Sequence, residues 1–131
     1  MATIKSYTDL EQSKKLAEIL PFESADMHYF IVDSLEKQEI NYAVRCGTPI
    51  VKTDIPGWSL AALLSILPNN EHITTSVSRG SWQLETITYL PNTWWCEYED
   101  SDNLTEFNTS TDNPVDACVE MIIRLNELNL L

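Results

Sequence analysis

The spacing of apolar side chains predicts a helix close to the N-terminus. Leucine, isoleucine and alanine recur at helical spacing over residues 8–20, and their charged neighbours fall on the opposite side. Thr8 and Glu11 have the spacing of a capping box, with Thr8 as the N-cap residue. Pro21 cannot continue a helix, so the helix is expected to end before it.

A second helix with a single apolar stripe is expected at the other end of the chain, over residues 114–128. Asp112 or Asn113 is expected to cap it, and Pro114 suits its first position, where the missing N–H costs nothing. The stripe runs along one side of the helix, which is typical of a helix that covers a core on that side. Its apolar members are Val115, Cys118, Val119, Ile122, Leu125 and Leu128.

The middle of the chain predicts a third helix of a different kind. Asp54 or Ile55 is expected to cap it, Pro56 to stand in its first turn and Pro68 to end it. Its apolar residues cover every side, which is typical of a buried helix. If the monomer leaves a strip of it uncovered, that strip is expected to form a homodimer interface. The residues predicted for such an assembly interface are Trp58, Leu60 and Leu64.

Strands are expected between and after these helices. Residues 27–33 and 40–46 alternate like the two arms of a hairpin. Residues 73–99 are rich in β-branched and aromatic residues, and two turn signals divide them, Arg79–Gly80 and Pro91–Asn92. A further edge strand is expected over residues 104–108.

The turn at Pro91 also predicts which side chains share a face. A four-residue loop is favoured, because proline cannot adopt the positive φ of the tightest hairpin turns. This register pairs Tyr89 with Trp94, Ile87 with Cys96 and Glu85 with Tyr98. The core face would then carry Tyr89, Ile87, Trp94, Cys96 and Tyr98. The face toward solvent would carry Thr86, Thr88, Trp95, Glu97 and Glu99. A three-residue loop would shift the pairing by one residue and exchange the faces.

The predicted order of elements is α-β-β-α-β-β-β-α. Short turns join the later strands, so they are expected to be antiparallel. We therefore expect a single α+β domain over residues 1–131, in which three helices pack on one antiparallel sheet.

The charge of the chain is strongly negative and uneven. Its formal net charge is −12, and ten acidic residues but only one basic residue, Arg124, follow Arg79. Such a field repels phosphate backbones, which excludes nucleic-acid binding through a basic patch and favours a basic protein partner. A purely solubilising role is the alternative. No apolar run is long enough to cross a bilayer and no signal peptide is visible, so a cytoplasmic location is expected.

The residues that usually carry chemistry do not form a recognisable pattern. Three cysteines lack metal-type spacing and are expected to be buried, reduced thiols; they are Cys46, Cys96 and Cys118. His28 lies in an apolar run and is expected to be structural, and His72 is expected to be exposed. No phosphate-binding glycine loop or hydrolase signature occurs. We therefore expect no enzyme activity, no cofactor and no metal site.

An acidic cluster beside tryptophans is the strongest candidate for a binding surface. Tryptophan flanked by carboxylates is a composition found in protein-binding hot spots, although core packing and a solvated charged face are the ordinary alternatives. The acidic pair Asp100 and Asp102 resembles the start of a calcium loop but lacks its later glycine and glutamate. The residues predicted to bind a partner are Trp95, Glu97, Glu99, Asp100 and Asp102.

Two longer segments resemble a family of small uncharacterised proteins of gut-bacterial phages and prophages. Residues 54–64 read DIPGWSLAALL and residues 112–121 read DNPVDACVEM, matching the family markers DIPxWSLxALL and DNPxDAxVEM. The resemblance extends from about residue 8 to the end of the chain. It implies an origin in a mobile element and a location in the cytoplasm of a bacterial host, but it assigns no activity and no site residue.

Together these patterns predict a non-enzymatic interaction protein. We expect it to bind a host or phage protein through the acidic, tryptophan-rich surface, with inhibition of a host defence protein or imitation of DNA as variants. The first alternative is a protein that sequesters a small nucleotide signal, for which only Arg45, Arg79 and Lys52 offer the charge. A purely structural role is the second alternative.

Overall fold

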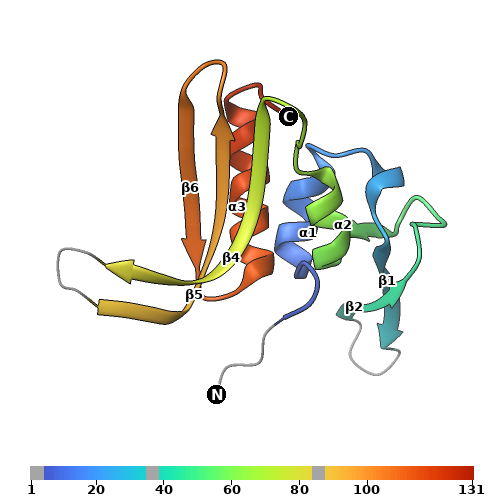
Figure 1. The fold of residues 1–131 in the computed structure, drawn as a ribbon. Coiled ribbons are helices and arrows are strands. Elements are labelled where there is room, and N and C mark those ends of the chain that lie inside the picture. Colours follow the sequence, from blue (N-terminus) through green and yellow to red (C-terminus); the bar gives the residue numbers. More distant parts are fainter. Residues whose placement is uncertain (1–4, 35–38, 84–87) are drawn as a thin grey trace.

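The computed structural model describes residues 5–34, 39–83 and 88–131, which form an α+β fold (Figure 1). Its strands build two antiparallel sheets of three strands each, with the orders β2-β1-β3 and β4-β5-β6. The elements are α1 Leu10–Ala17, the short 3₁₀ helix η1 Phe22–Ser24, β1 Met27–Ser34, β2 Glu39–Cys46, β3 Ile55–Gly57, α2 Leu60–Ile66, β4 Ile73–Gln83, β5 Thr88–Asp100, β6 Thr105–Thr111 and α3 Pro114–Glu127.

The predicted fold class is confirmed, and the order of elements agrees apart from the short strand β3. The strands form two sheets, however, rather than the one sheet that the sequence suggested. The helices lie between the sheets: α3 packs against β4, β5 and β6, and α1 and α2 lie between α3 and the β1–β2 hairpin (Figure 1). One cluster of buried apolar residues joins α1, α2, β5 and α3. Among the described residues, no helix is long and apolar enough to cross a membrane.

The first helix begins one residue later than the capping box in the sequence indicated. Asp9 is the N-cap residue, and its side chain accepts from the backbone N–H of Gln12 while the Gln12 side chain accepts from the N–H of Asp9. Thr8 is instead completely buried. Its hydroxyl group bonds to the Ser13 hydroxyl at 2.7 Å and accepts from the backbone N–H of Trp58 at 3.1 Å, so Thr8 joins α1 to the segment before α2.

The expected middle helix is shorter than predicted and is not buried on every side. Residues 55–57, including Pro56, form β3, and α2 starts only after Ser59, which caps it. Asp54 does not cap a helix either: its carboxylate accepts from the backbone N–H groups of Ile50 and Val51, and these bonds lower the pKa of Asp54. Leu64 is 42% exposed, so one side of α2 faces solvent.

The C-terminal helix and the first hairpin agree with the sequence. Asn113 caps α3, with Pro114 next to it, and the predicted stripe is buried except at Leu128, which is 46% exposed. The hairpin of β1 and β2 pairs Met27 with Cys46 at its open end. The edge strand expected near residue 104 is also present, as β6.

The expected turns at Arg79–Gly80 and Pro91–Asn92 are wrong, because both segments lie inside long strands. β4 continues past Gly80 and β5 runs through Pro91. These strands pair with each other, so Cys96 lies opposite Val77 rather than Ile87. Glu85 and Ile87, the residues predicted to pair with Tyr98 and Cys96, lie outside the described residues.

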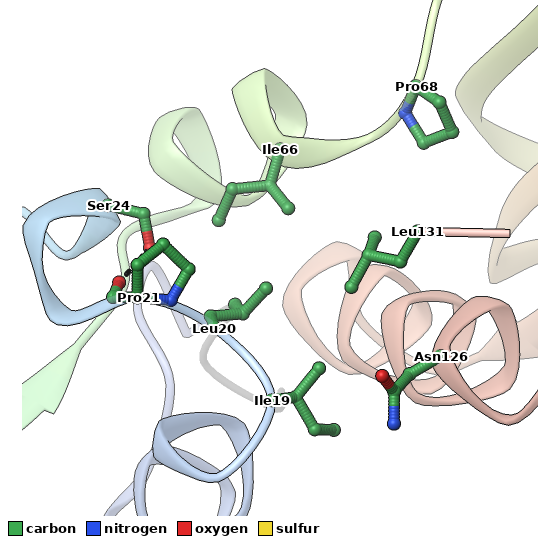
Figure 2. A pocket seen from close by; sticks show the side chains of 8 residues that line it. All are labelled: Ile19, Leu20, Pro21, Ser24, Ile66, Pro68, Asn126 and Leu131. Atoms are coloured by element: carbon green, nitrogen blue, oxygen red, sulfur yellow. Dashed lines mark hydrogen bonds between the residues drawn. The ribbon is translucent and has the colours of Figure 1, made fainter. Parts of the chain in front are cut away.

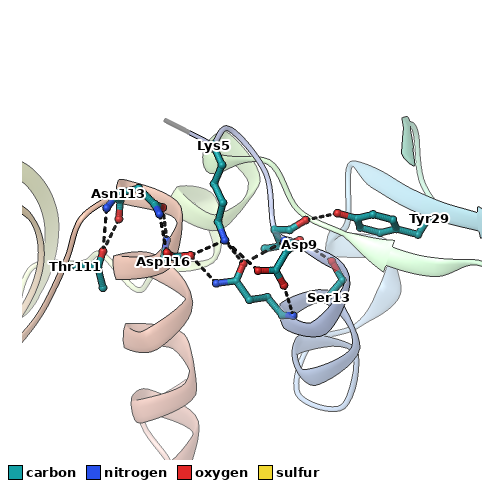
Figure 3. Close-up of polar contacts among 9 residues, drawn as sticks. Lys5, Asp9, Ser13, Tyr29, Thr111, Asn113 and Asp116 are labelled. Carbon is teal, nitrogen blue, oxygen red and sulfur yellow. Dashed lines mark hydrogen bonds and ion pairs between the residues drawn. The ribbon is translucent and has the colours of Figure 1, made fainter. Parts of the chain in front are cut away.

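A polar network joins the N-terminal segment to α1 and α3 (Figure 3). The Lys5 ammonium lies 2.7 Å from an Asp116 carboxylate oxygen and 3.1 Å from one of Asp9. Gln12 accepts from Lys5 at 2.9 Å and donates to Asp116 at 2.6 Å. The network therefore ties together the first turns of two helices, where carboxylates are favoured by the helix dipole.

We expect the contribution of Asp116 to stability to depend on pH. Burial opposes its charged form, but hydrogen bonds from Lys5, Gln12 and Asn113 outweigh burial and lower the pKa of Asp116. Since the pKa is lower in the folded chain, acid protonates the unfolded chain first, and the stabilisation present at neutral pH is lost below about pH 4. Urea unfolding should show Asp116→Asn to be less stable than the wild type at pH 7, and the difference should shrink as the pH falls from about 5 to about 3. The exposed Asp112→Asn controls for the loss of one charge, and a difference independent of pH would contradict the prediction.

Candidate functional site

The second sheet has one face toward α3 and one face away from it. Cys96 and Tyr98 on β5 are completely buried, and Thr109 on β6 donates to the backbone carbonyl of Ala117 in α3 at 2.8 Å, so these residues mark the inner face. Alternate residues of each strand point the other way. We call these residues the outer face: Thr74, Ser76, Ser78, Trp95, Glu97, Glu99, Glu106, Asn108 and Ser110.

The outer face carries only negative charge. Glu97, Glu99 and Glu106 are exposed, and Glu99 lies directly opposite Glu106 in the β5–β6 pairing. The other members of the outer face are hydroxyl or amide residues and Trp95. Like charges placed opposite each other on neighbouring strands destabilise a sheet, so this arrangement does not serve the stability of the fold.

Trp95 is the one large apolar side chain on the outer face. It lies on the central strand between Ser78 and Ser110, and it is half-buried. Its indole N–H is covered and has no hydrogen-bond partner within the described part of the chain. Trp94, the next residue, belongs to the other face, where the Arg79 guanidinium lies 5.8 Å from its ring centre. The prediction that Trp95, Glu97 and Glu99 share an exposed face therefore agrees with the structure.

Asp100 and Asp102 do not join this face. Asp100 is buried, and hydrogen bonds from the Asn103 side chain first, and then from the backbone of Asn103 and Asp102, lower its pKa. Asp102 is exposed in the β5–β6 turn, and a carboxylate oxygen lies 3.1 Å from His72 Nδ1. The inclusion of Asp100 in the predicted binding surface is thus corrected: its carboxylate holds the turn, and Asp102 stands beside His72.

The three residues predicted for an assembly interface lie in different surroundings. Trp58 is completely buried and its indole N–H donates to the Ser24 hydroxyl at 3.0 Å, so it cannot contact a second chain. Leu60 is partly buried against the core, and Leu64 is exposed. Trp58 differs from the two leucines because α2 begins only after its N-cap residue Ser59. Trp58 therefore precedes the helix and is buried in the core.

The buried hydroxyl group of Tyr98 provides a test of the inner face. It has no hydrogen-bond partner among the described residues, and burial, with a further contribution from Asp100, raises its pKa. We expect Tyr98→Phe to raise the free energy of unfolding by about 1 kcal/mol in urea titrations, because no hydrogen bond is lost. Tyr29→Phe is the matched control: the Tyr29 hydroxyl donates to the Thr8 carbonyl at 2.6 Å, so its removal should destabilise. Destabilisation by Tyr98→Phe would contradict the prediction.

The histidines and cysteines have structural surroundings. The Arg45 guanidinium donates to His28 Nε2 at 2.5 Å, which leaves the proton on Nδ1, and this atom donates to the Gly47 carbonyl at 2.7 Å. The prediction of a structural histidine is therefore confirmed. Cys96 and Cys118 are buried free thiols, but Cys46 is exposed, which corrects its predicted burial. No cluster of potential metal ligands occurs in residues 5–34, 39–83 and 88–131.

Several surface cavities are lined by described residues. A small one of about 220 Å³ lies at the β5–β6 turn and is lined partly by Glu99 and Glu106. Two others are mainly apolar. One, of about 390 Å³, lies where the ends of α1, α2 and α3 meet; it is lined by Ile19, Leu20, Pro21, Ser24, Ile66, Pro68, Asn126 and Leu131 (Figure 2). The other, of about 410 Å³, adjoins η1 and contains Lys52 and Asp54. Arg45 and Arg79 line none of these cavities, so the three cations considered for a nucleotide ligand do not converge there.

Comparisons of the chain with protein-family models, curated proteins and solved structures found no match. Sequence reasoning identified three members of the outer face but missed Glu106 and the hydroxyl residues of β4 and β6. No sequence signal places Glu106 on this face, because its position depends on the pairing of β6 with β5.

Proposed function

We propose that the protein binds a basic segment of a partner protein through the outer face of the second sheet. Trp95 would supply the apolar contact, and Glu97, Glu99 and Glu106 would supply the charge. In this proposal the protein is a binding protein and not an enzyme. The resemblance to phage and prophage proteins suggests that the partner is a bacterial host or phage protein, with the blocking of a host defence protein as one form of this role.

The observation that supports the proposal most strongly is the isolation of Trp95 among carboxylates. A half-buried tryptophan on a sheet face gains apolar contact when another protein covers the exposed part of its ring. The surrounding glutamates speed the approach of a basic partner and oppose an acidic one. The nucleotide alternative has no comparable support, because the considered cations do not meet at any of the described cavities.

Affinity capture from a bacterial lysate with matched variants tests the proposal. Glu97→Lys combined with Glu99→Lys reverses the charge of the outer face, and Trp95→Ala removes the apolar contact. The control combines Glu120→Lys with Glu127→Lys, which changes the net charge equally on the exposed side of α3. Circular dichroism should first confirm that each variant is folded.

We expect a basic protein to be captured by the wild type and the α3 control and to be lost with both outer-face variants. Capture by the wild type should also weaken as salt rises, because exposed charges are screened. Capture of the same proteins by the wild type and the outer-face variants would exclude this face as the binding surface.

A further inference from the structure

The register of the second sheet determines which backbone groups of β6 are free to bond outward. Ile73 on β4 bonds away from β5: its N–H donates to the Asn70 side chain and its carbonyl accepts from the Asn70 N–H. Its partner Asp100 therefore bonds toward β6, and the bonding direction alternates along each antiparallel strand. It follows that the backbone groups of Glu106, Asn108 and Ser110 point away from β5.

The two edges of this sheet differ in what covers them. On β4, the segment before the strand occupies the edge: Asn70 pairs with Ile73, and the Asn69 side chain accepts from the Thr75 N–H at 2.9 Å. On β6, the structure records no hydrogen bond from the described residues to the outward backbone groups of residues 106, 108 and 110. β6 lies at the margin of the molecule (Figure 1). It also lacks the proline and lysine that usually protect an edge.

From these observations we infer that β6 accepts an extended segment of the partner as a fourth strand of the sheet, and that this segment carries lysine or arginine at every second position. The inference rests on the proposed function and specifies how the partner is held. Backbone hydrogen bonds to Glu106, Asn108 and Ser110 supply the attachment. Alternate side chains of the added strand lie on the outer face, where they meet the carboxylates of Glu106, Glu97 and Glu99.

Charge complementarity favours a basic partner over a second copy of this chain. Two β6 strands paired edge to edge would place the outer-face glutamates of both copies on one continuous sheet face. Each chain also has a net charge of −12, so the approach of two copies is opposed. A basic strand neutralises the same surface.

A peptide of alternating lysine and threonine, labelled for fluorescence anisotropy, is a direct probe, with a glutamine–threonine peptide as the neutral control. Asn108→Pro removes one outward N–H and leaves the β5 pairing intact, because proline is tolerated at an edge where its nitrogen faces solvent. Asn108→Ala removes the same side chain but keeps the N–H. We expect Asn108→Pro to weaken binding of the lysine peptide about tenfold, the loss expected for one or two backbone hydrogen bonds, and Asn108→Ala to change it less than about twofold.

Peptides methylated on backbone nitrogen give a second measurement that does not depend on how a variant folds. If the peptide adds as an antiparallel strand, lysines on the outer face have their N–H groups directed at β6, so methylation at lysine should abolish binding and methylation at threonine should not. A parallel strand would reverse the two results. The edge-strand inference would be overturned if the peptides methylated at lysine and at threonine bound with equal affinity and Asn108→Pro did not change binding.

The same titrations separate this inference from the proposed function. Loss of binding with Glu97→Lys and Glu99→Lys but not with Asn108→Pro would leave the acidic face as the binding site and exclude strand addition. If none of these changes alters binding, or the lysine peptide does not bind the wild type, both proposals fail. Concentration-dependent dimerisation in sedimentation that Asn108→Pro abolishes would show that a second copy occupies the edge, and would overturn the inference.

Discussion

Replacing Trp58 with alanine should lower the free energy of unfolding by about 3–5 kcal/mol, the range typical of deleting a large buried aromatic side chain. Trp58 is completely buried in the cluster that joins α1, α2, β5 and α3. The cavity left behind lies between elements from both ends of the chain, so it cannot collapse without moving several of them. Since small domains are stable by only about 5–15 kcal/mol, this single change removes a large part of the total.

Urea unfolding measured by circular dichroism checks this expectation, with two further variants to separate its causes. Trp58→Phe keeps most of the apolar volume but loses the hydrogen bond from the indole N–H to Ser24, so it should cost less than Trp58→Ala. Leu64→Ala removes a side chain that is 42% exposed on α2 and should have a small effect. Equal effects from Trp58→Ala and Leu64→Ala would contradict the position of Trp58 in the core.

The sequence predictions were correct where a periodic apolar pattern was accompanied by residues that mark the ends of the element. The last helix has a cap, a proline at its first position and one apolar stripe, and all three signals agree on Pro114–Glu127. The sequence of residues 54–68 was compatible with more than one structure. Pro56 is compatible both with the first turn of a helix and with a short strand. This segment forms a strand because it pairs with β1, where Tyr29 lies opposite Ile55. Tertiary pairing of this kind is not visible in local sequence.

The turns predicted in the β-rich region failed for a related reason. Arg79 pairs with Trp94 and Ser81 pairs with Leu90, so the single residue Gly80 faces three residues of β5 that include Pro91. The glycine and the proline therefore lie in an irregularity of two paired strands, where proline need not donate a ladder hydrogen bond. Local sequence does not distinguish such a bulge from a hairpin turn.

The candidate site was partly predictable because side chains alternate in a strand whichever strand pairs with it. Trp95, Glu97 and Glu99 share one face in the wrong predicted register and in the observed one. The same alternation places Asp100 on the opposite face, where it accepts bonds from Asn103. The proximity of Glu106 could not be predicted, because it depends on the pairing of β5 with β6.

Thr8→Val should destabilise the protein by about 2–4 kcal/mol, because valine keeps the volume of threonine but removes its hydroxyl group. The Trp58 N–H and the Ser13 hydroxyl would then lose their bonds to Thr8 Oγ1 in a completely buried position. Thr8→Ser retains the oxygen and loses one methyl group, which should cost about 1 kcal/mol.

Comparison with Asp9→Ala, measured in the same urea titrations, separates this buried role from helix capping. Loss of the actual N-cap at exposed Asp9 should cost about 1 kcal/mol, less than Thr8→Val. If Thr8→Ser were as destabilising as Thr8→Val, the methyl group rather than the hydrogen bonds would be responsible. If Thr8→Val were harmless, the hydroxyl group would not be needed to hold α1 against the segment that leads into α2.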